Sequence, residues 1–372
     1  MSCFNRIWFC LVVLTAALGG TPARSRDLGP VAEALRTLAQ AHSEAHDQAG
    51  IALAVVDGGG KVWPAACGLA DRERGLPAGS ATLFELGSIS KIFTCIAVMQ
   101  LREQGKVDLD RPYLSYVPEF SVQSAFPGGA GAITVRMLMT HMSGLVADDD
   151  AWETTHPARD FHRAVLEHVK DSQLLYEPGR RWHYSSFGTS LLGVLVECLS
   201  GLAFADYMQR NVLQPMGMAS ASFDLRGMDQ GSLSAGYHHD PAYDLIPKDE
   251  IRPGGSLRAS IEESAKLMAF LAGRGAVAGH AILQPGSLDE MLRLQNPGCA
   301  EQPMGLGFRI HPQGGNGQAG WVYHDGTSRN RSFFMFVPAW NTGFIVVVND
   351  FRGCDLFLWE LKEAFLEAMA AA

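Results

Sequence analysis

The chain has 372 residues, of which 47% are hydrophobic and 19% are charged. This composition supplies enough apolar side chains for a core and excludes a disordered or collagen-like chain. With 30 Lys+Arg against 39 Asp+Glu, the formal net charge is −9, which argues against binding to nucleic acid or to an anionic membrane surface.

The first 23 residues have the pattern of a cleavable signal peptide. Arg6 precedes an apolar run from Ile7 to Leu18, and small residues follow, ending in Thr21-Pro22-Ala23. The run is shorter than the roughly 20 residues needed to span a bilayer. An uncleaved anchor or a buried N-terminal helix is the alternative. We therefore expect residues 24–372 to be a periplasmic or secreted protein with no membrane span after signal removal.

The next segments predict a helix, a hairpin and a second helix. Residues from Pro30 to Gln48 place apolar side chains at helical spacing. Residues 51–68 (IALAVVDGGGKVWPAACG) have the pattern of two strands around a glycine turn. A helix is predicted from about Ser88 to Gln104, and Gly105 ends it.

The middle of the chain, from about 105 to 255, is predicted to consist of helical segments separated by Gly and Pro. Ser260 and Ser287 each begin an S-x-x-E pattern that predicts a capped helix start. After residue 303 the pattern changes to strands (GLGFRIH, AGWVYHD, RSFFMFVP and GFIVVVND), and a helix is predicted from Asp355 to Ala372.

This order of elements predicts an α+β fold. We expect an antiparallel sheet flanked by helices and built from both ends of the chain, residues of about 26–104 and 256–372. The mostly helical subdomain of about 105–255 is expected to be inserted between those two segments.

The strongest local signal for chemistry is the segment FELGSISKIFT, residues 84–94. Ser88 and Lys91 are three residues apart at a helix start, so their side chains share one face. A serine hydroxyl becomes a nucleophile when a base takes its proton, and an amine can do so if its surroundings lower its pKa. Alone this pattern is weak, because such a pair is usually a helix cap beside a solvated charge.

The segment resembles the nucleophile motif of the penicillin-recognising serine hydrolases, which include class C β-lactamases, DD-peptidases and related esterases. Further similarities follow in the family's order over roughly residues 30–350. One is TVRMLMTHMSGL, which contains His141, Ser143 and Gly144, and another is YEPGRRWHYSSFGTS. The resemblance implies a β-lactamase/transpeptidase-like fold. We expect no cofactor and no metal site.

The second motif of this family, Tyr-x-Asn, resembles Tyr184-Ser185-Ser186. The resemblance implies that Tyr184 transfers protons together with Lys91. An ordinary half-buried tyrosine beside a helix start is the alternative. Ser186 replaces the family's Asn, which contacts the catalytic lysine and the amide carbonyl of the substrate. A serine is shorter and offers a single hydroxyl for these contacts.

The third motif, Lys-Thr-Gly or His-x-Gly, resembles His324-Asp325-Gly326-Thr327. The resemblance implies that the N–H groups of Ser88 and Thr327 form an oxyanion hole and that Gly326 lets a substrate backbone approach. His324 is mostly neutral at pH 7, so it would hold a substrate carboxylate less firmly than lysine. Asp-Gly between two strand-like runs is also a common hairpin turn.

Together these motifs predict a secreted serine hydrolase. It would form a covalent acyl-enzyme with an ester or with a D-amino-acid amide or peptide, so its expected partner is a small molecule or a cell-wall peptide. A class C-like β-lactamase is one alternative, which Ser186 and His324 disfavour. A non-catalytic protein that binds muropeptides or β-lactams is the alternative from another class.

Overall fold

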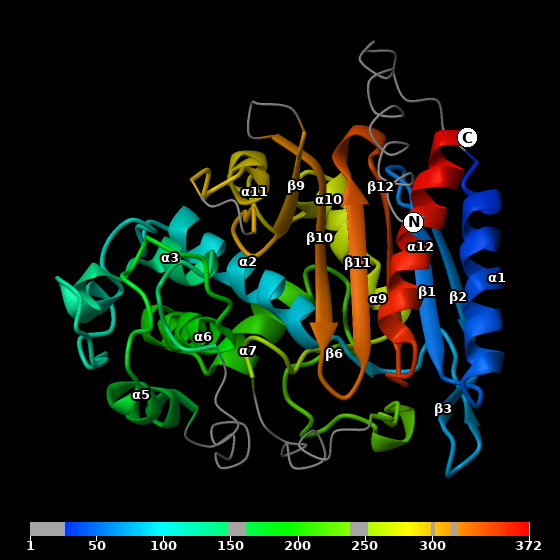
Figure 1. Ribbon diagram of the computed structural model, residues 1–372, viewed down its shortest axis with the longest axis horizontal. Coiled ribbons are helices and arrows are strands. Elements are labelled where there is room, and N and C mark those ends of the chain that lie inside the picture. Colours follow the sequence, from blue (N-terminus) through cyan, green and yellow to red (C-terminus); the bar gives the residue numbers. More distant parts are fainter. Residues whose placement is uncertain (1–26, 148–160, 239–251, 299–301, 314–317, 372) are drawn as a thin grey trace, which may run out of the picture.

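The computed structural model describes residues 27–147, 161–238, 252–298, 302–313 and 318–371 (Figure 1). The predicted signal peptide, residues 1–23, lies outside the described residues. A six-stranded antiparallel sheet in the order β2-β1-β12-β11-β10-β9 runs through the centre of the molecule. Its strands are β1 (Ile51–Val56), β2 (Val62–Cys67), β9 (Arg309–Gln313), β10 (Gln318–Thr327), β11 (Arg331–Val337) and β12 (Thr342–Val348).

Short strands and helices complete the described part of the chain. The short strands pair two by two as β3 (Leu69–Asp71) with β4 (Leu76–Pro77), β5 (Phe84–Glu85) with β6 (Arg258–Ala259), and β7 (Ala276–Val277) with β8 (His280–Ala281). The helices are α1 (Gly29–Ala45), α2 (Ser90–Glu103), α3 (Val135–Met139), α5 (Phe161–Asp171), α6 (Ser186–Ser200), α7 (Phe204–Met208), α9 (Ile261–Ser264), α10 (Lys266–Ala272), α11 (Pro285–Leu292) and α12 (Cys354–Ala371).

The prediction of an α+β fold with an antiparallel sheet flanked by helices is confirmed. The sheet joins both ends of the chain, because β1 pairs along its length with β12, from Ile51 opposite Val348 to Val56 opposite Gly343. Helices α3, α5, α6 and α7 come from the middle of the chain and lie together on one side of the sheet (Figure 1). The boundaries of the two predicted subdomains stay a prediction.

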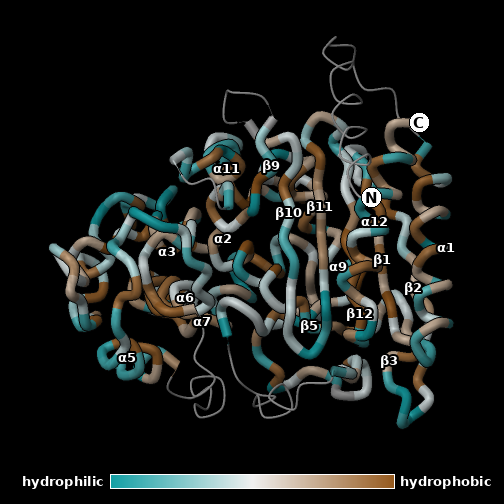
Figure 2. Tube along the Cα trace, viewed as in Figure 1, coloured by the Kyte–Doolittle hydropathy of each residue, from teal (hydrophilic) through white to brown (hydrophobic). Residues whose placement is uncertain are grey.

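Helices cover both faces of the sheet, which explains why every residue of β1 is buried. Successive side chains of a strand point to opposite faces. Leu53 and Val55 pack with α1 and α12, whereas Ala52 and Ala54 face the cluster that contains α2 and α6. The apolar tracts of these strands are visible in Figure 2. A continuous apolar run is therefore what this central position requires.

Helix α2 carries the predicted nucleophile segment into the core. Each of its residues from Ser90 to Met99 is buried, because the helix packs against α6 inside the main hydrophobic cluster. A helix enclosed in this way is apolar on nearly every face. Among the described residues, no single helix has both the length and the apolar character to cross a membrane; α6 and the segment Phe204–Leu213 meet that test only as a pair bent by 78°.

Two predicted helix starts have different outcomes. The capping box at Ser260 is confirmed, since its hydroxyl accepts the N–H of Glu263 and the Glu263 carboxylate accepts the N–H of Ser260. The cap at Ser287 is wrong, because α11 already begins at Pro285 and Ser287 is buried inside it. Proline has the backbone angle of a first helical turn, so it starts this helix ahead of the serine.

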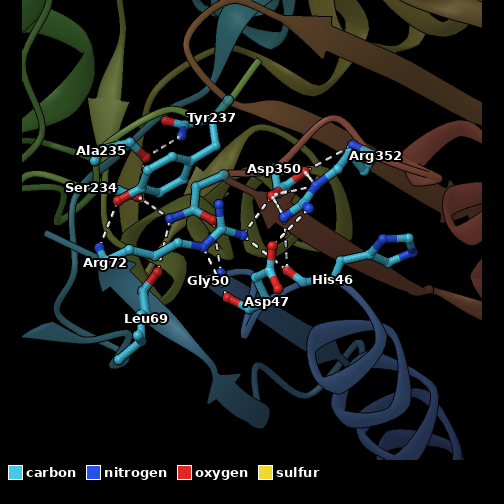
Figure 3. Close-up of polar contacts among 12 residues, drawn as sticks. His46, Asp47, Gly50, Leu69, Arg72, Ser234, Ala235, Tyr237, Asp350 and Arg352 are labelled. Carbon is cyan, nitrogen blue, oxygen red and sulfur yellow. Dashed lines mark hydrogen bonds and ion pairs between the residues drawn. The ribbon is translucent and has the colours of Figure 1, made fainter. Parts of the chain in front are cut away.

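A network of charged residues around the buried Asp350 lies just after β12 (Figure 3). Asp350 is 1% exposed and accepts hydrogen bonds from Arg72 and Arg352, and Arg352 also pairs with Asp47 at 2.8 Å. Burial alone would raise the pKa of Asp350, but the hydrogen bonds from Arg352 and Arg72 lower it to about 2. The Asp350 network thereby ties the residues after α1, β3 and β12 to one another.

Candidate active site

Ser88 lies in a 3₁₀ turn, Gly87–Ile89, that leads directly into α2. The turn packs against the end of β10: a Cβ on Gly87 would lie 2.7 Å from the backbone nitrogen of Thr327, and Gly87 has a φ of +53°. Only glycine tolerates both the contact and this left-handed backbone. Gly87 therefore brings the turn that carries Ser88 against Thr327, as an oxyanion hole built from their N–H groups requires.

Lys91 is held beside Ser88 by three hydrogen bonds. Its side chain is buried, and Nζ lies 3.0 Å from Ser88 Oγ, 3.0 Å from Ser186 Oγ and 2.9 Å from the carbonyl oxygen of Gly254. A protonated Lys91 can donate to all three oxygens, and a neutral Lys91 can instead accept the proton of Ser88. The expected contact between Lys91 and Ser186 is thus present in the structure.

Tyr184 approaches Ser88 from the helical side of the molecule. Its hydroxyl donates to Ser88 Oγ at 2.7 Å, and Lys91 Nζ lies 4.9 Å from the centre of its ring. Ser88 Oγ therefore touches two groups that can exchange protons, an amine and a phenol. That arrangement is the one in which a serine hydroxyl can be activated for attack.

His141 positions the segment that carries Tyr184 and Ser186, a role that sequence reasoning missed. Its Nδ1 accepts the N–H of Ser185 at 3.2 Å, and its carbonyl oxygen accepts the N–H of His183 at 2.8 Å. Its ring lies 4.5 Å from the ring of Tyr184. Burial, followed by the nearby Lys91, holds the pKa of His141 well below its usual value, so the ring stays neutral and can accept.

The two serines after Tyr184 have separate tasks. Ser185 caps α6, since its Oγ accepts the N–H of Gly188 at 3.0 Å and donates to the carbonyl oxygen of Val146 at 2.6 Å. Ser186 begins the helix and turns toward Lys91. The cap fixes the start of α6, and with it the place of the Ser186 hydroxyl.

The residues of the third motif form the end of strand β10, and not a hairpin turn. Strand β9 pairs with β10 only as far as Arg309 opposite Tyr323, whereas β11 continues along residues 324–327. A Cβ on Gly326 would lie 2.2 Å from the carbonyl oxygen of Leu86. Gly326 is therefore required where β10 packs against the segment that precedes Ser88; the predicted approach of a substrate backbone stays a prediction.

His324 belongs to this end of β10, and its side chain is buried. Burial lowers the pKa of His324 to about 4; the Asp325 carboxylate raises it, but the charges of Arg309 and Lys91 oppose that effect, so the ring is neutral at pH 7. Its Nδ1 lies 2.6 Å from the carbonyl oxygen of Asp325 and must carry the proton, which leaves Nε2 as an acceptor. In the part of the chain that the structure describes, Nε2 has no hydrogen-bond partner.

A buried ionic cluster lies next to the segment that carries the nucleophile. Glu85, which is 3% exposed, pairs with Arg252 at 3.0 Å and with Arg258 at 2.7 Å. Burial would raise the pKa of Glu85, but the two arginines outweigh it and lower the pKa. The pairs join the strand before Ser88 to the loop whose Gly254 carbonyl accepts from Lys91.

Comparison with known proteins assigns this arrangement to a family. A sequence profile described as "Beta-lactamase" matches residues 35–363, nearly the whole chain. The chain belongs to the β-lactamase family. The resemblance found in the motifs is thereby confirmed, and the protein is a serine hydrolase of that family.

Two curated relatives of this β-lactamase-family chain carry informative names. It is 34% identical over 184 residues to "Esterase EstB" of Burkholderia gladioli, which is 46% of each protein. It is 22% identical over 313 residues to "Protein flp" of Staphylococcus aureus, covering 81% of the chain and 59% of the relative. The chain thus spans about half of the length of these relatives.

Solved structures share the fold. A structure described as SurE with D-Leu has a TM-score of 0.72 and 25% identity, over 90% of this chain and 76% of SurE. A class C β-lactamase has a TM-score of 0.75 and 19% identity, over 92% of this chain and 97% of the other. The β-lactamase/transpeptidase-like fold predicted from the motifs is therefore confirmed.

Proposed function

We propose that this member of the β-lactamase family hydrolyses an ester, or the amide or peptide of a D-amino acid, through a covalent acyl-enzyme on Ser88. The observation that carries the proposal is that Lys91 Nζ and Tyr184 OH both lie within hydrogen-bond distance of Ser88 Oγ. Two proton-exchanging groups on one hydroxyl are what nucleophilic catalysis by serine needs.

In the proposed reaction, the Lys91–Tyr184 pair starts with one proton fewer than an ammonium and a phenol hold together. Ser88 Oγ attacks the substrate carbonyl carbon while its proton passes to the unprotonated member of that pair. The N–H groups of Ser88 and Thr327 hold the negative charge on the carbonyl oxygen. The bond to the leaving group then breaks, and the pair returns the proton to the leaving oxygen or nitrogen. Water attacks the acyl-enzyme in the second step, so that the acid is released and Ser88 is restored.

The substrate class is argued from the third motif and from the relatives. His324 is neutral, so the site lacks the lysine that would attract a carboxylate. The relative with 34% identity is called an esterase, and SurE is described with D-Leu. These observations favour an ester or a D-amino-acid derivative over a β-lactam. The segment 1–23 further supports a periplasmic or secreted location.

The proposal is tested with the full chain, Ser88→Ala and Ser90→Ala. The Ser90 hydroxyl accepts the N–H of Leu257 at 3.1 Å, so this control removes a serine hydroxyl two residues away from Ser88. We expect the wild type and Ser90→Ala to hydrolyse 4-nitrophenyl esters or D-amino-acid amides, and Ser88→Ala to lose at least about 1,000-fold in kcat/KM.

Mass spectrometry of the intact protein adds a second readout. A transient acyl adduct should form on the wild type and be absent from Ser88→Ala. Turnover that survives in Ser88→Ala would overturn the proposal. Penicillin consumed without a lasting adduct, with no ester or amide turnover, would replace it with a β-lactamase. Binding of muropeptides without any turnover would indicate a non-catalytic protein.

A further inference from the structure

We infer that Asp325 and Arg309 form a charge filter that disfavours substrates with a carboxylate next to the scissile bond. The inference rests on the proposed function and names a specificity determinant of the same site. The residue between His324 and Gly326 in the third motif is an acid, Asp325.

The pair lies at the rim of the site. Arg309 Nη1 is 3.2 Å from Asp325 Oδ1, and the centre of the guanidinium is 5.7 Å from the centre of the Tyr184 ring. The side chains of Arg309 and Asp325 are 22% and 36% exposed, so solvent reaches both. Arg309 therefore lies beside both the second motif, at Tyr184, and the third motif, at Asp325.

The register of the sheet explains the contact. Arg309 is the first residue of β9 and lies opposite Tyr323 of β10. Tyr323 and Asp325 are two residues apart on one strand, so their side chains point to the same face. Arg309 reaches Asp325 as its diagonal neighbour, a distance that a long side chain spans.

Among the residues that the structure describes, the other charged groups discussed at this site already have partners. Lys91 donates to three uncharged oxygens, and Arg331 binds Thr327 Oγ1 and Asp355. His324 is neutral. A substrate carboxylate near β10 would thus meet the negative Asp325 and an arginine whose charge Asp325 balances. A neutral ester or amide meets no such repulsion.

Specificity of this kind is a difference between two affinities, and an unfavourable contact with the wrong ligand can supply it. Removing the charge of Asp325 would both end the repulsion and release Arg309 to face the carboxylate. Both effects favour the substrate that carries a carboxylate. A partly exposed charge about 4 Å from a charge on the ligand changes binding by about tenfold.

The test compares phenyl acetate with 3-carboxyphenyl acetate, which share an acyl group and differ in one charge. The measured quantity is the ratio of kcat/KM for the anionic ester to that for the neutral ester. We expect Asp325→Asn to raise this ratio about tenfold; the ratio cancels any change that affects both esters equally. The rise should shrink at high salt, since ions screen exposed charges.

Two further variants separate the filter from a general change in charge. Asp289→Asn removes an acid from the Arg274–Asp289 pair, 2.9 Å apart on the surface, and should leave the ratio unchanged. Adding Arg309→Gln to Asp325→Asn should cancel the part of the rise that comes from the released cation and leave the part that comes from the lost repulsion. Asp325→Ser serves as a second replacement if Asp325→Asn does not fold.

The outcomes distinguish the inference from the function on which it rests. If phenyl acetate is hydrolysed in a Ser88-dependent manner but the ratio stays the same in both Asp325 variants, the charge filter is wrong. If Asp289→Asn raises the ratio as much as Asp325→Asn, overall charge replaces the filter as the explanation. If the wild type hydrolyses neither ester nor any D-amino-acid amide, the proposed function itself has failed.

Discussion

Two polar clusters, the Ser88 site and the Asp350 network, join distant parts of this chain by different chemistry. At the site, the Lys91 amine is surrounded by the uncharged oxygens of Ser88, Ser186 and Gly254. In the Asp350 network, by contrast, each charge meets an opposite charge. Burying an amine without a counter-ion costs folding free energy, but the amine can exchange a proton with its neighbours. Balanced ion pairs, by contrast, stabilise the fold.

The largest expected effect comes from removing the amine at the site. Lys91→Met should lower kcat/KM for the best ester at least about 1,000-fold, because proton transfer to and from Ser88 loses a partner. Methionine retains most of the apolar stem, so the free energy of unfolding should change by about 1 kcal/mol or less. Steady-state kinetics and thermal melting measure the two effects.

The control for this variant is Lys106→Met, at an exposed lysine just after α2. It should leave both kcat/KM and melting temperature near the wild-type values. Activity of Lys91→Met above a tenth of the wild type would contradict the assigned proton transfer.

The second effect falls on stability and is expected to leave chemistry intact. Asp350→Asn removes the carboxylate that balances Arg72 and Arg352, and should lower the free energy of unfolding by about 3 kcal/mol. Urea denaturation measures this loss. Below the unfolding transition, kcat/KM should match the wild type. A drop in kcat/KM in folded Asp350→Asn would show that the two clusters are coupled.

The smallest effect is a pH dependence of stability near the same network. His42 stacks on Phe357 with ring centres 4.2 Å apart, and burial, followed by the charge of His46, lowers its pKa to about 4. An unfolded histidine titrates near pH 6.5. The unfolded chain therefore binds more protons between pH 6.5 and 4, so the stability present above pH 6.5 is lost as the pH falls through this window.

Urea midpoints for the wild type and His42→Gln, compared at pH 7.5 and 4.5, isolate this contribution. Because His42 is only partly buried, we expect about 1–2 kcal/mol of the pH-dependent loss to disappear in the variant. Parallel pH profiles for the two proteins would assign the loss to other groups.

The sequence predicted the parts of the site that depend on short spacing. Ser88 and Lys91 share a helix face by their separation alone, and Tyr184 and Ser186 were found through the order of the family's motifs. Gly254 could not be found in this way, because it contributes a backbone oxygen that any residue type would supply. Its place is set by the pairing of β5 with β6.

Arg309 was missed for a related reason. Its contact with Asp325 depends on the register between β9 and β10, and no periodicity in either strand reveals register. The fold class was easier to predict, since continuous apolar runs and helical spacing are local patterns. The wrong cap at Ser287 shows the limit of such patterns where a nearby proline also starts a helix.

The position of β12 has a consequence for how the protein reaches its native state. This strand, residues 342–348, is the last of the sheet to be synthesised, yet it lies between β1 and β11. Until it is made, the two halves of the sheet have no common partner, so β10 and the nucleophile turn lack their final support. Such a topology has a high contact order and favours slow folding after synthesis. Helices α1 and α12 pack side by side (Figure 1). A circular permutant that joins them would bring β12 and β1 close together in the chain, so that these two strands could pair early in folding.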